Sequence, residues 1–149
     1  MTEKRKMIPL TAKAPEPAQP VQSEQPEVSL YESVGGTAFF VNLVDDFYSQ
    51  VEAQPLVRSL YHDDLTQPKA DLSQFLAQYW GGPTTYSDTK GHPRLRMRHA
   101  PFKIGVEQQV VWLACMQAAV SQSPAGDVEK RALNDYFAMA SKQMINWMD

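Results

Sequence analysis

Apolar residues recur at three- and four-residue steps in four stretches, the spacing that puts side chains on one face of an α-helix. The first stretch follows the Gly35-Gly36 pair, after which Thr37 is a suitable N-cap. The second stops at Gly81-Gly82-Pro83, a strong helix terminator. The third runs from about residue 104 to 122 and is apolar nearly all round between residues 110 and 120, so we expect it to be central. The stripes of the other three are Phe39, Phe40, Leu43, Val44, Phe47, Tyr48 and Val51; Leu72, Phe75, Leu76, Tyr79 and Trp80; and Leu133, Tyr136, Phe137, Ala140, Met144, Ile145 and Met148.

The remaining pattern contains no strand signal. There is no alternating run of β-branched residues and no Asn-Gly hairpin turn. The sequence therefore predicts an all-α domain over residues 29–149, with four substantial helices and short helical pieces near residues 56–60 and 94–98.

Residues 1–28 differ from the rest of the chain. They hold Pro9, Pro15, Pro17, Pro20 and Pro26, and they lack any aromatic side chain. Such a segment buries too little apolar surface to offset the entropy of ordering it. We expect a flexible, disordered, proline-rich extension, with docking on a partner as the alternative.

Composition narrows the class of protein. Lys and Arg total 14 against 17 Asp and Glu, a net charge of −3, which argues against a nucleic-acid-binding surface. Cys115 is the single cysteine, so neither an internal disulfide nor a cysteine-rich zinc module is expected. No apolar run approaches the ~20 residues that cross a bilayer, and no signal peptide is visible, so we expect no membrane partner and a cytoplasmic location.

The segment from Gly81 to Pro101 has little periodicity, which is unusual for a small helical domain and typical of functional loops. Its second half carries four basic residues together with His92 and His99. The chain's three histidines show no metal-binding spacing, and no nucleotide motif is present. A cofactor that needs one protein ligand remains open, and haem fits because one imidazole suffices for its iron. His99 is the best candidate ligand, and a purely structural histidine is the competing interpretation.

Two stretches at the ends of this segment, QYWGGP (residues 78–83) and GHPRLRMRHAPF (residues 91–102), resemble the group II truncated haemoglobins. The upstream VGG and DFY motifs and Trp112 strengthen the resemblance, which covers nearly everything after residue 28. It implies a two-over-two helical sandwich around haem b.

The resemblance also implies residue roles. His99 is the iron ligand, and Tyr48, Tyr61 and Trp112 are the distal residues that would act on the bound ligand. An indole donates only, and tyrosine hydroxyls donate as well, so these groups would stabilise a ligand such as O2 that gains partial negative charge. Further haem contacts are expected from apolar walls and from propionate partners: Pro68, Leu72, Phe75, Leu76, Tyr86, Arg98 and Phe102.

Some positions depart from common family members. Pro68, early in the second helix, adds no polar group and leaves the route into the pocket open. Asp71 stands where a basic propionate partner is often found. His62 follows Tyr61 directly, so it is either a further distal donor or sixth iron ligand, or an exposed loop residue.

The implied function is binding of O2, CO or NO at the haem. Three donors would slow ligand escape, which suits redox chemistry, or detoxification of NO or peroxide, better than O2 delivery. An NO dioxygenase or peroxidase-like activity would need an external reductase, since no reductase domain is encoded. A ligand or redox sensor acting on a partner, simple O2 storage, and a haem-free helical module remain alternatives. Either a monomer or a homodimer is compatible with the sequence.

Overall fold

Eight helices follow one another along residues 28–148, the part of the chain that the computed structural model describes. The expected disordered extension therefore lies outside the described residues, apart from Val28. No strand occurs among residues 28–148. The helices are α2 (Leu30–Val34), α3 (Thr37–Glu52), α4 (Pro55–Arg58), α5 (Thr66–Tyr79), α6 (Thr85–Lys90), α7 (Leu95–His99), α8 (Val106–Gln122) and α9 (Asp127–Gln143).

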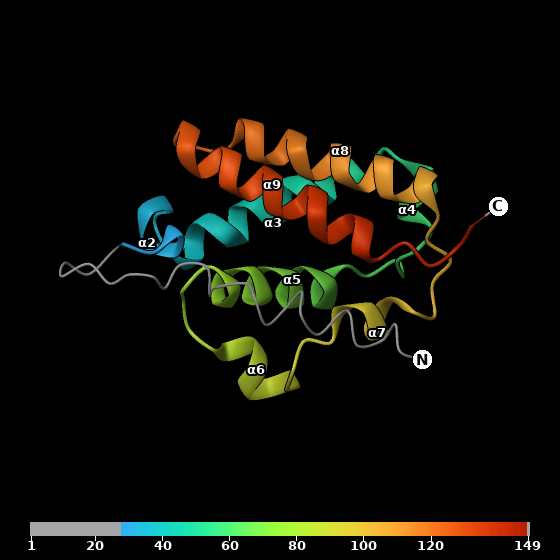
Figure 1. Ribbon diagram of the computed structural model, residues 1–149, viewed down its shortest axis with the longest axis horizontal. Coiled ribbons are helices and arrows are strands. Elements are labelled where there is room, and N and C mark those ends of the chain that lie inside the picture. The colour runs from blue at the N-terminus through green and yellow to red at the C-terminus, as the bar shows by residue number, and fades with distance from the viewer. Residues whose placement is uncertain (1–27, 149) are drawn as a thin grey trace.

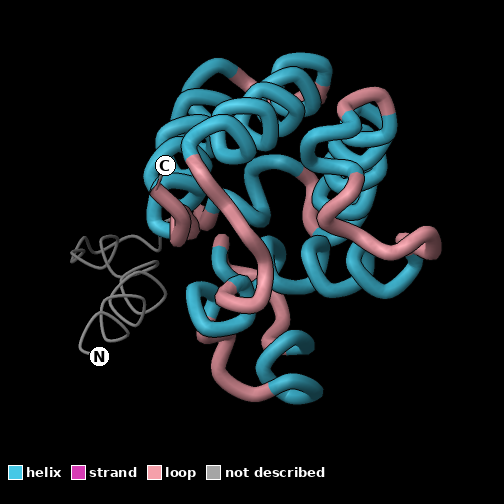
Figure 2. The backbone as a smooth tube through the Cα atoms, turned by 90° about the vertical axis from the view of Figure 1, so that its right-hand side faces the viewer, coloured by secondary structure: helices cyan, strands magenta, loops and turns pink. Residues whose placement is uncertain are grey.

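The four long helices form two pairs. Helix α3 packs against α5 and α8, and α8 packs against α9. Figure 1 shows α8 and α9 side by side at the top, α5 below them, and α6 and α7 at the lower edge of the molecule. Figure 2, turned by 90°, shows the two layers from the side, joined by loops. This two-over-two sandwich is the all-α architecture expected from the sequence.

The core lies where α3, α8 and α9 meet. Phe40 and Phe47 of α3, Met116 of α8, and Leu133 and Phe137 of α9 are almost completely excluded from solvent. These residues belong to the stripes that predicted the helices, so burying those faces against one another explains the pairing.

The Gly81-Gly82 pair ends α5, and close contacts leave no room for a side chain at Gly82. The Gly82 amide donates to the Ala77 carbonyl at 2.7 Å. A Cβ at Gly82 would lie 2.5 Å from the Tyr31 ring and 2.8 Å from that carbonyl, so no larger residue fits without rearrangement. Gly81 has φ +109°, a left-handed conformation that glycine adopts at little cost.

Three boundaries differ from the sequence prediction. Gly36 is the N-cap of α3, while the Thr37 hydroxyl pairs with the Tyr31 hydroxyl at 2.6 Å. Helix α8 begins at Val106, and α9 ends at Gln143. The segment before α8 and the segment after α9 pair with each other: the backbone amide of Asn146 donates to the Ile104 carbonyl at 2.8 Å. This pairing accounts for non-helical backbone at both positions.

Helix α6 lies inside the segment that lacked periodicity. The Gln78 side chain accepts from the Ser87 amide at 2.9 Å and donates to the Ser87 hydroxyl at 2.7 Å, which ties α6 to α5.

Among the described residues, no helix is long and apolar enough to span a bilayer.

Candidate functional site

A mainly apolar cavity lies between the two helical layers. Side chains from α4, α5, α7, α8 and α9 and from the connections between them form its walls. The lining residues are Val57, Leu60, Tyr61, Leu72, Phe75, Leu76, Leu95, His99, Phe102, Ile104, Gln108, Gln109, Trp112, Tyr136, Phe137, Ala140, Ser141 and Met144. The structure thus brings together seven of the residues singled out in the sequence: Tyr61, Leu72, Phe75, Leu76, His99, Phe102 and Trp112.

His99 is the last residue of α7 and the single histidine on the cavity wall. Its Nδ1 lies 2.7 Å from the Leu95 carbonyl oxygen. Because a carbonyl can only accept, Nδ1 carries the ring proton and Nε2 keeps its lone pair. Burial lowers the pKa of His99, against an opposing effect of the Leu95 hydrogen bond, so the neutral imidazole is favoured.

Three aromatic side chains with hydrogen-bonding groups, from α3, α8 and the turn after α4, lie close to one another. Tyr48, on α3, is 3% exposed, and its ring centroid lies 5.3 Å from that of Tyr61 in an edge-to-face arrangement. Burial raises the pKa of Tyr61, and the neighbouring Trp112 indole and Tyr48 hydroxyl oppose that shift in part. Burial, together with the nearby Tyr61, raises the pKa of Tyr48. Both tyrosine hydroxyls therefore stay protonated at neutral pH, as donors must.

Tyr48 itself does not line the cavity, but its ring packs against that of Tyr61, which does. His62 is exposed and is also absent from the lining. Pro68 lies in the first turn of α5, half-buried and away from the lining.

The two expected propionate partners, Tyr86 and Arg98, lie outside the cavity lining. Tyr86 is buried behind Phe75, with 5.5 Å between ring centroids. Arg98 is exposed, donates to the Pro93 carbonyl at 2.7 Å and the Lys90 carbonyl at 3.1 Å, and lies over the Tyr86 ring. It thus stabilises the loop that leads into α7.

Asp71 would repel a haem propionate less than its negative charge suggests. Its carboxylate lies 3.3 Å from the Lys90 ammonium and accepts from the Gln67 amide at 2.8 Å. Lys90 comes from α6, so the ion pair joins α5 to α6 and neutralises the charge.

Sequence reasoning missed the contribution of α9 and one polar pair. Tyr136, Phe137, Ala140 and Met144 lie on the cavity wall, although their stripe was assigned only to helix packing. The buried Gln109 donates to the buried Ser141 hydroxyl at 2.8 Å, joining α8 and α9 beside the cavity. Nothing in the sequence distinguished Gln109 from the adjacent Gln108 as the partner of Ser141.

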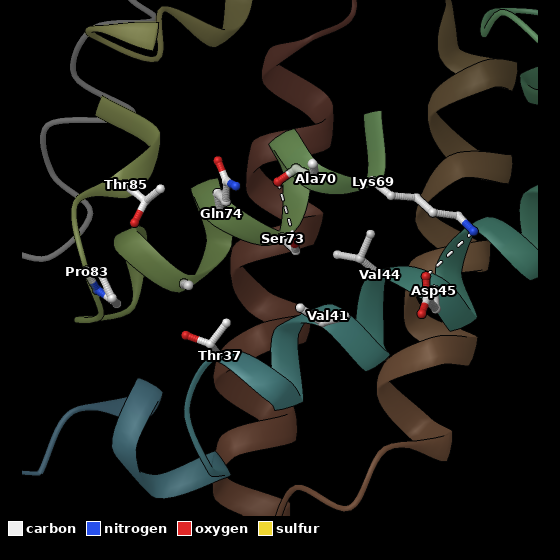
Figure 3. Close-up of a pocket in the computed structure, with 11 residues that line it drawn as sticks. Thr37, Val41, Val44, Asp45, Lys69, Ala70, Ser73, Gln74, Pro83 and Thr85 are labelled. Atoms are coloured by element: carbon white, nitrogen blue, oxygen red, sulfur yellow. Dashed lines mark hydrogen bonds and ion pairs between the residues drawn. The ribbon is translucent and has the colours of Figure 1, made fainter. Parts of the chain in front are cut away.

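A second pocket, of about 330 Å³, lies between α3, α5 and the start of α6 (Figure 3). Lys69 and Asp45 form an ion pair of 3.6 Å at one end, and the other lining residues are small or polar. None of the candidate haem or ligand contacts named from the sequence lines it. It therefore contributes nothing to the His99 site.

The residues of the first cavity fit a haem group. A single imidazole with a free Nε2 lone pair supplies one axial ligand, and one is sufficient for haem iron. Leu72, Phe75, Leu76 and Phe137 supply the apolar surface that a flat macrocycle needs.

Comparisons with known proteins agree with this arrangement. The family model described as bacterial-like globin matches residues 29–146. The group 2 truncated haemoglobin YjbI of Bacillus subtilis is 36% identical over 116 residues, covering 78% of this chain and 87% of that protein. Among solved structures, the haemoglobin of Chloroflexus aurantiacus is 45% identical with a TM-score of 0.79, covering 81% of this chain and 100% of the other. The group II truncated haemoglobin of Bacillus anthracis is 36% identical with a TM-score of 0.78, covering 83% and 94%.

A match along almost the whole described chain shows the family, and the two-over-two fold with one cavity-facing histidine agrees with it. The chain therefore belongs to the bacterial-like globins and is a group II truncated haemoglobin, a type of globin that binds haem and small gaseous ligands.

Proposed function

We propose that the chain binds haem b through Nε2 of His99 and holds O2, CO or NO beside Tyr61, Tyr48 and Trp112. We further propose that the held ligand serves redox chemistry, namely detoxification of NO or peroxide, more than O2 delivery. The bound haem would supply the iron site at which a diatomic ligand or peroxide binds.

The placement of Tyr61 and Trp112 carries this proposal. Both side chains line the cavity, where the tyrosine hydroxyl and the indole N–H can each donate a hydrogen bond. The Tyr48 ring packs edge-to-face against the Tyr61 ring and so supports it from outside the cavity. Hydrogen bonds are stronger in a low-dielectric interior, so a partially negative ligand would be held firmly.

The chain's part in the chemistry follows from these contacts. His99 presents a neutral imidazole oriented by Leu95, and the apolar walls exclude water from the reacting ligand. Slow ligand release favours reaction of held O2 with NO, or of peroxide, over transport. Such turnover consumes electrons, so we propose an external reductase as partner and a cytoplasmic location. Whether the protein acts as a monomer or a homodimer does not alter these roles.

The first test is the absorption spectrum of the purified protein in ferric, reduced and CO-bound forms, with His99→Ala alongside. We expect a Soret band that shifts with CO, a five-coordinate reduced form, and loss of this behaviour in His99→Ala. No Soret band after haem addition would refute haem binding.

The second test measures O2 off-rates for Tyr61→Phe and Tyr48→Phe. We expect faster release in both, with the larger effect at Tyr61 because its hydroxyl is the nearer donor. Fast release from the wild type would instead favour O2 storage. Rapid reduction of the ferric protein by a cellular reductase, followed by consumption of NO, would support the detoxification role.

A further inference from the structure

Arg58 forms an unusual concentration of contacts at the end of α4. Its Nη1 donates to the His62 carbonyl at 2.9 Å and to the Tyr61 carbonyl at 3.4 Å. Its Nη2 donates to the Asp63 carbonyl at 3.1 Å. Three consecutive carbonyls of one turn thus converge on a single guanidinium group.

The same side chain is itself held in place. The Arg58 Nε lies 3.3 Å from a Glu52 carboxylate oxygen at the end of α3, and the Arg58 side chain is 20% exposed. A guanidinium presents five N–H donors in a rigid planar fork, so one orientation can serve the carboxylate on one edge and the turn on the other. A lysine ammonium has no such fork.

The turn that Arg58 holds decides which side chain faces the cavity. Tyr61 lies on the cavity wall against Tyr48 and Trp112, while the next residue, His62, is exposed. Neighbouring residues of a non-helical turn point in different directions, so a shift of one position along the backbone would exchange them. Beyond the turn, the Asp64 carboxylate accepts from the Thr66 amide at 2.9 Å, which fixes the other end of the turn where α5 begins.

We propose that Arg58 is a positioning residue: by binding the carbonyls of residues 61–63 it keeps Tyr61 directed into the cavity and holds His62 outside it. A haem in the cavity would then keep its distal side open for gaseous ligands. Without this contact, His62 gains access to the same space and competes for the iron. The inference rests on the proposed haem site, but the orientation of Tyr61 is a property of the chain alone.

The test uses Arg58→Met, which keeps much of the aliphatic stem and removes every donor. Two of the three carbonyls are solvent-exposed and water can satisfy them, so the variant keeps its fold. In the haem-loaded protein we expect the six-coordinate fraction to rise at least tenfold above the wild type. We expect Arg58→Met/His62→Ala to return to the wild-type coordination.

Two further measurements separate positioning from general support. In the wild type, Tyr61→Phe should speed ligand release, whereas in the Arg58→Met background the same change should have little effect. In protein without haem, the nuclear Overhauser contact between the Tyr48 and Tyr61 rings should be present in the wild type and lost in Arg58→Met. Arg58→Lys provides a milder variant should Arg58→Met fail to fold, and it should show an intermediate shift.

Glu52→Gln is the matched control, because it removes the ion pair and leaves the turn's hydrogen bonds in place. We expect it to stay five-coordinate. A folded Arg58→Met protein with wild-type coordination, an intact ring contact and a full Tyr61→Phe effect would overturn the proposal. Six-coordination that survives His62→Ala would overturn it as well. A wild type without a Soret band would refute the haem site, while the ring contact would still decide the role of Arg58.

Discussion

The segment that follows α9 fastens the loop that follows His99, and its key residue is Asn146. The Asn146 Nδ2 donates to the Phe102 carbonyl at 2.9 Å and to the His99 carbonyl at 3.2 Å. Its Oδ1 accepts from the Ile104 amide at 2.9 Å. Asn146→Ala removes all three bonds and leaves the backbone pairing with Ile104 intact.

The size of the loss follows from the exposure of each bond. The two carbonyl contacts are exposed and are worth about 0.5 kcal/mol each, while the half-buried bond from Ile104 is worth about 1 kcal/mol. We therefore expect a loss of about 2 kcal/mol in the free energy of unfolding. For a chain of this size that corresponds to a fall in Tm of about 4–8 °C, measured by circular dichroism.

A second assay links the change to the site. Asn146 binds the backbone of His99, so its removal loosens the residue that presents the imidazole, and haem should transfer faster to an excess of another haem-binding globin. Asn146→Asp keeps the acceptor for Ile104 and should lie between alanine and wild type. Met148→Ala, at a side chain that is 82% exposed, should change neither quantity. A loss below about 0.5 kcal/mol in Asn146→Ala, with unchanged haem transfer, would refute the reasoning.

Three further outcomes are expected. His99→Gly should lose the five-coordinate reduced spectrum, and added imidazole should restore it, because the cavity would accept the missing ring. Trp112→Phe should raise the O2 off-rate by about tenfold in stopped-flow experiments, since the cavity wall loses the indole N–H donor to the ligand, worth about 1.4 kcal/mol. The Thr66 amide and side chain lower the pKa of Asp64, so its stabilisation is full above the unfolded-state pKa and is lost as pH falls through the lower, folded-state value. Asp64→Asn keeps an acceptor for the Thr66 amide without the titrating carboxylate, so the thermal stability of this variant should depend less on pH on the acid side.

Much of the fold could be predicted because apolar stripes carry it. The stripes of α3, α5 and α9 are the surfaces by which these helices pack, and the terminator after α5 acts through Gly81 and Gly82 as expected. Helix α6 could not be predicted, since its sequence TYSDTK has no apolar face. The contacts that hold α6 are the Ser87–Gln78 hydrogen bonds and the Lys90–Asp71 ion pair. They join it to α5 and form only when the chain is folded.

The sequence likewise indicated some residues of the candidate site and gave no sign of others. The motif around His99 identified the cavity's histidine, and family resemblance indicated Tyr61 and Trp112, all of which line the cavity. Spacing along the chain carried no information about the wall formed by α9, because an apolar stripe does not reveal which side of a helix faces a cavity and which faces core. Arg98 shows a further role that the sequence did not reveal. Its position beside His99 suggests an anion partner, and the structure adds that its guanidinium donates to the Pro93 and Lys90 carbonyls.

The cavity has apolar walls, yet polar side chains that do not line it set the orientation of its functional groups. Arg58 binds the turn that carries Tyr61, and Asn146 binds the loop that begins at His99. Apolar packing is nondirectional and tolerates small shifts of a loop, whereas hydrogen bonds to successive carbonyls do not. Substitution at Arg58 should therefore change which side chain meets the ligand, and substitution at Asn146 should change how firmly the imidazole is held. Neither change should alter how the four long helices pack, since neither residue belongs to the buried core.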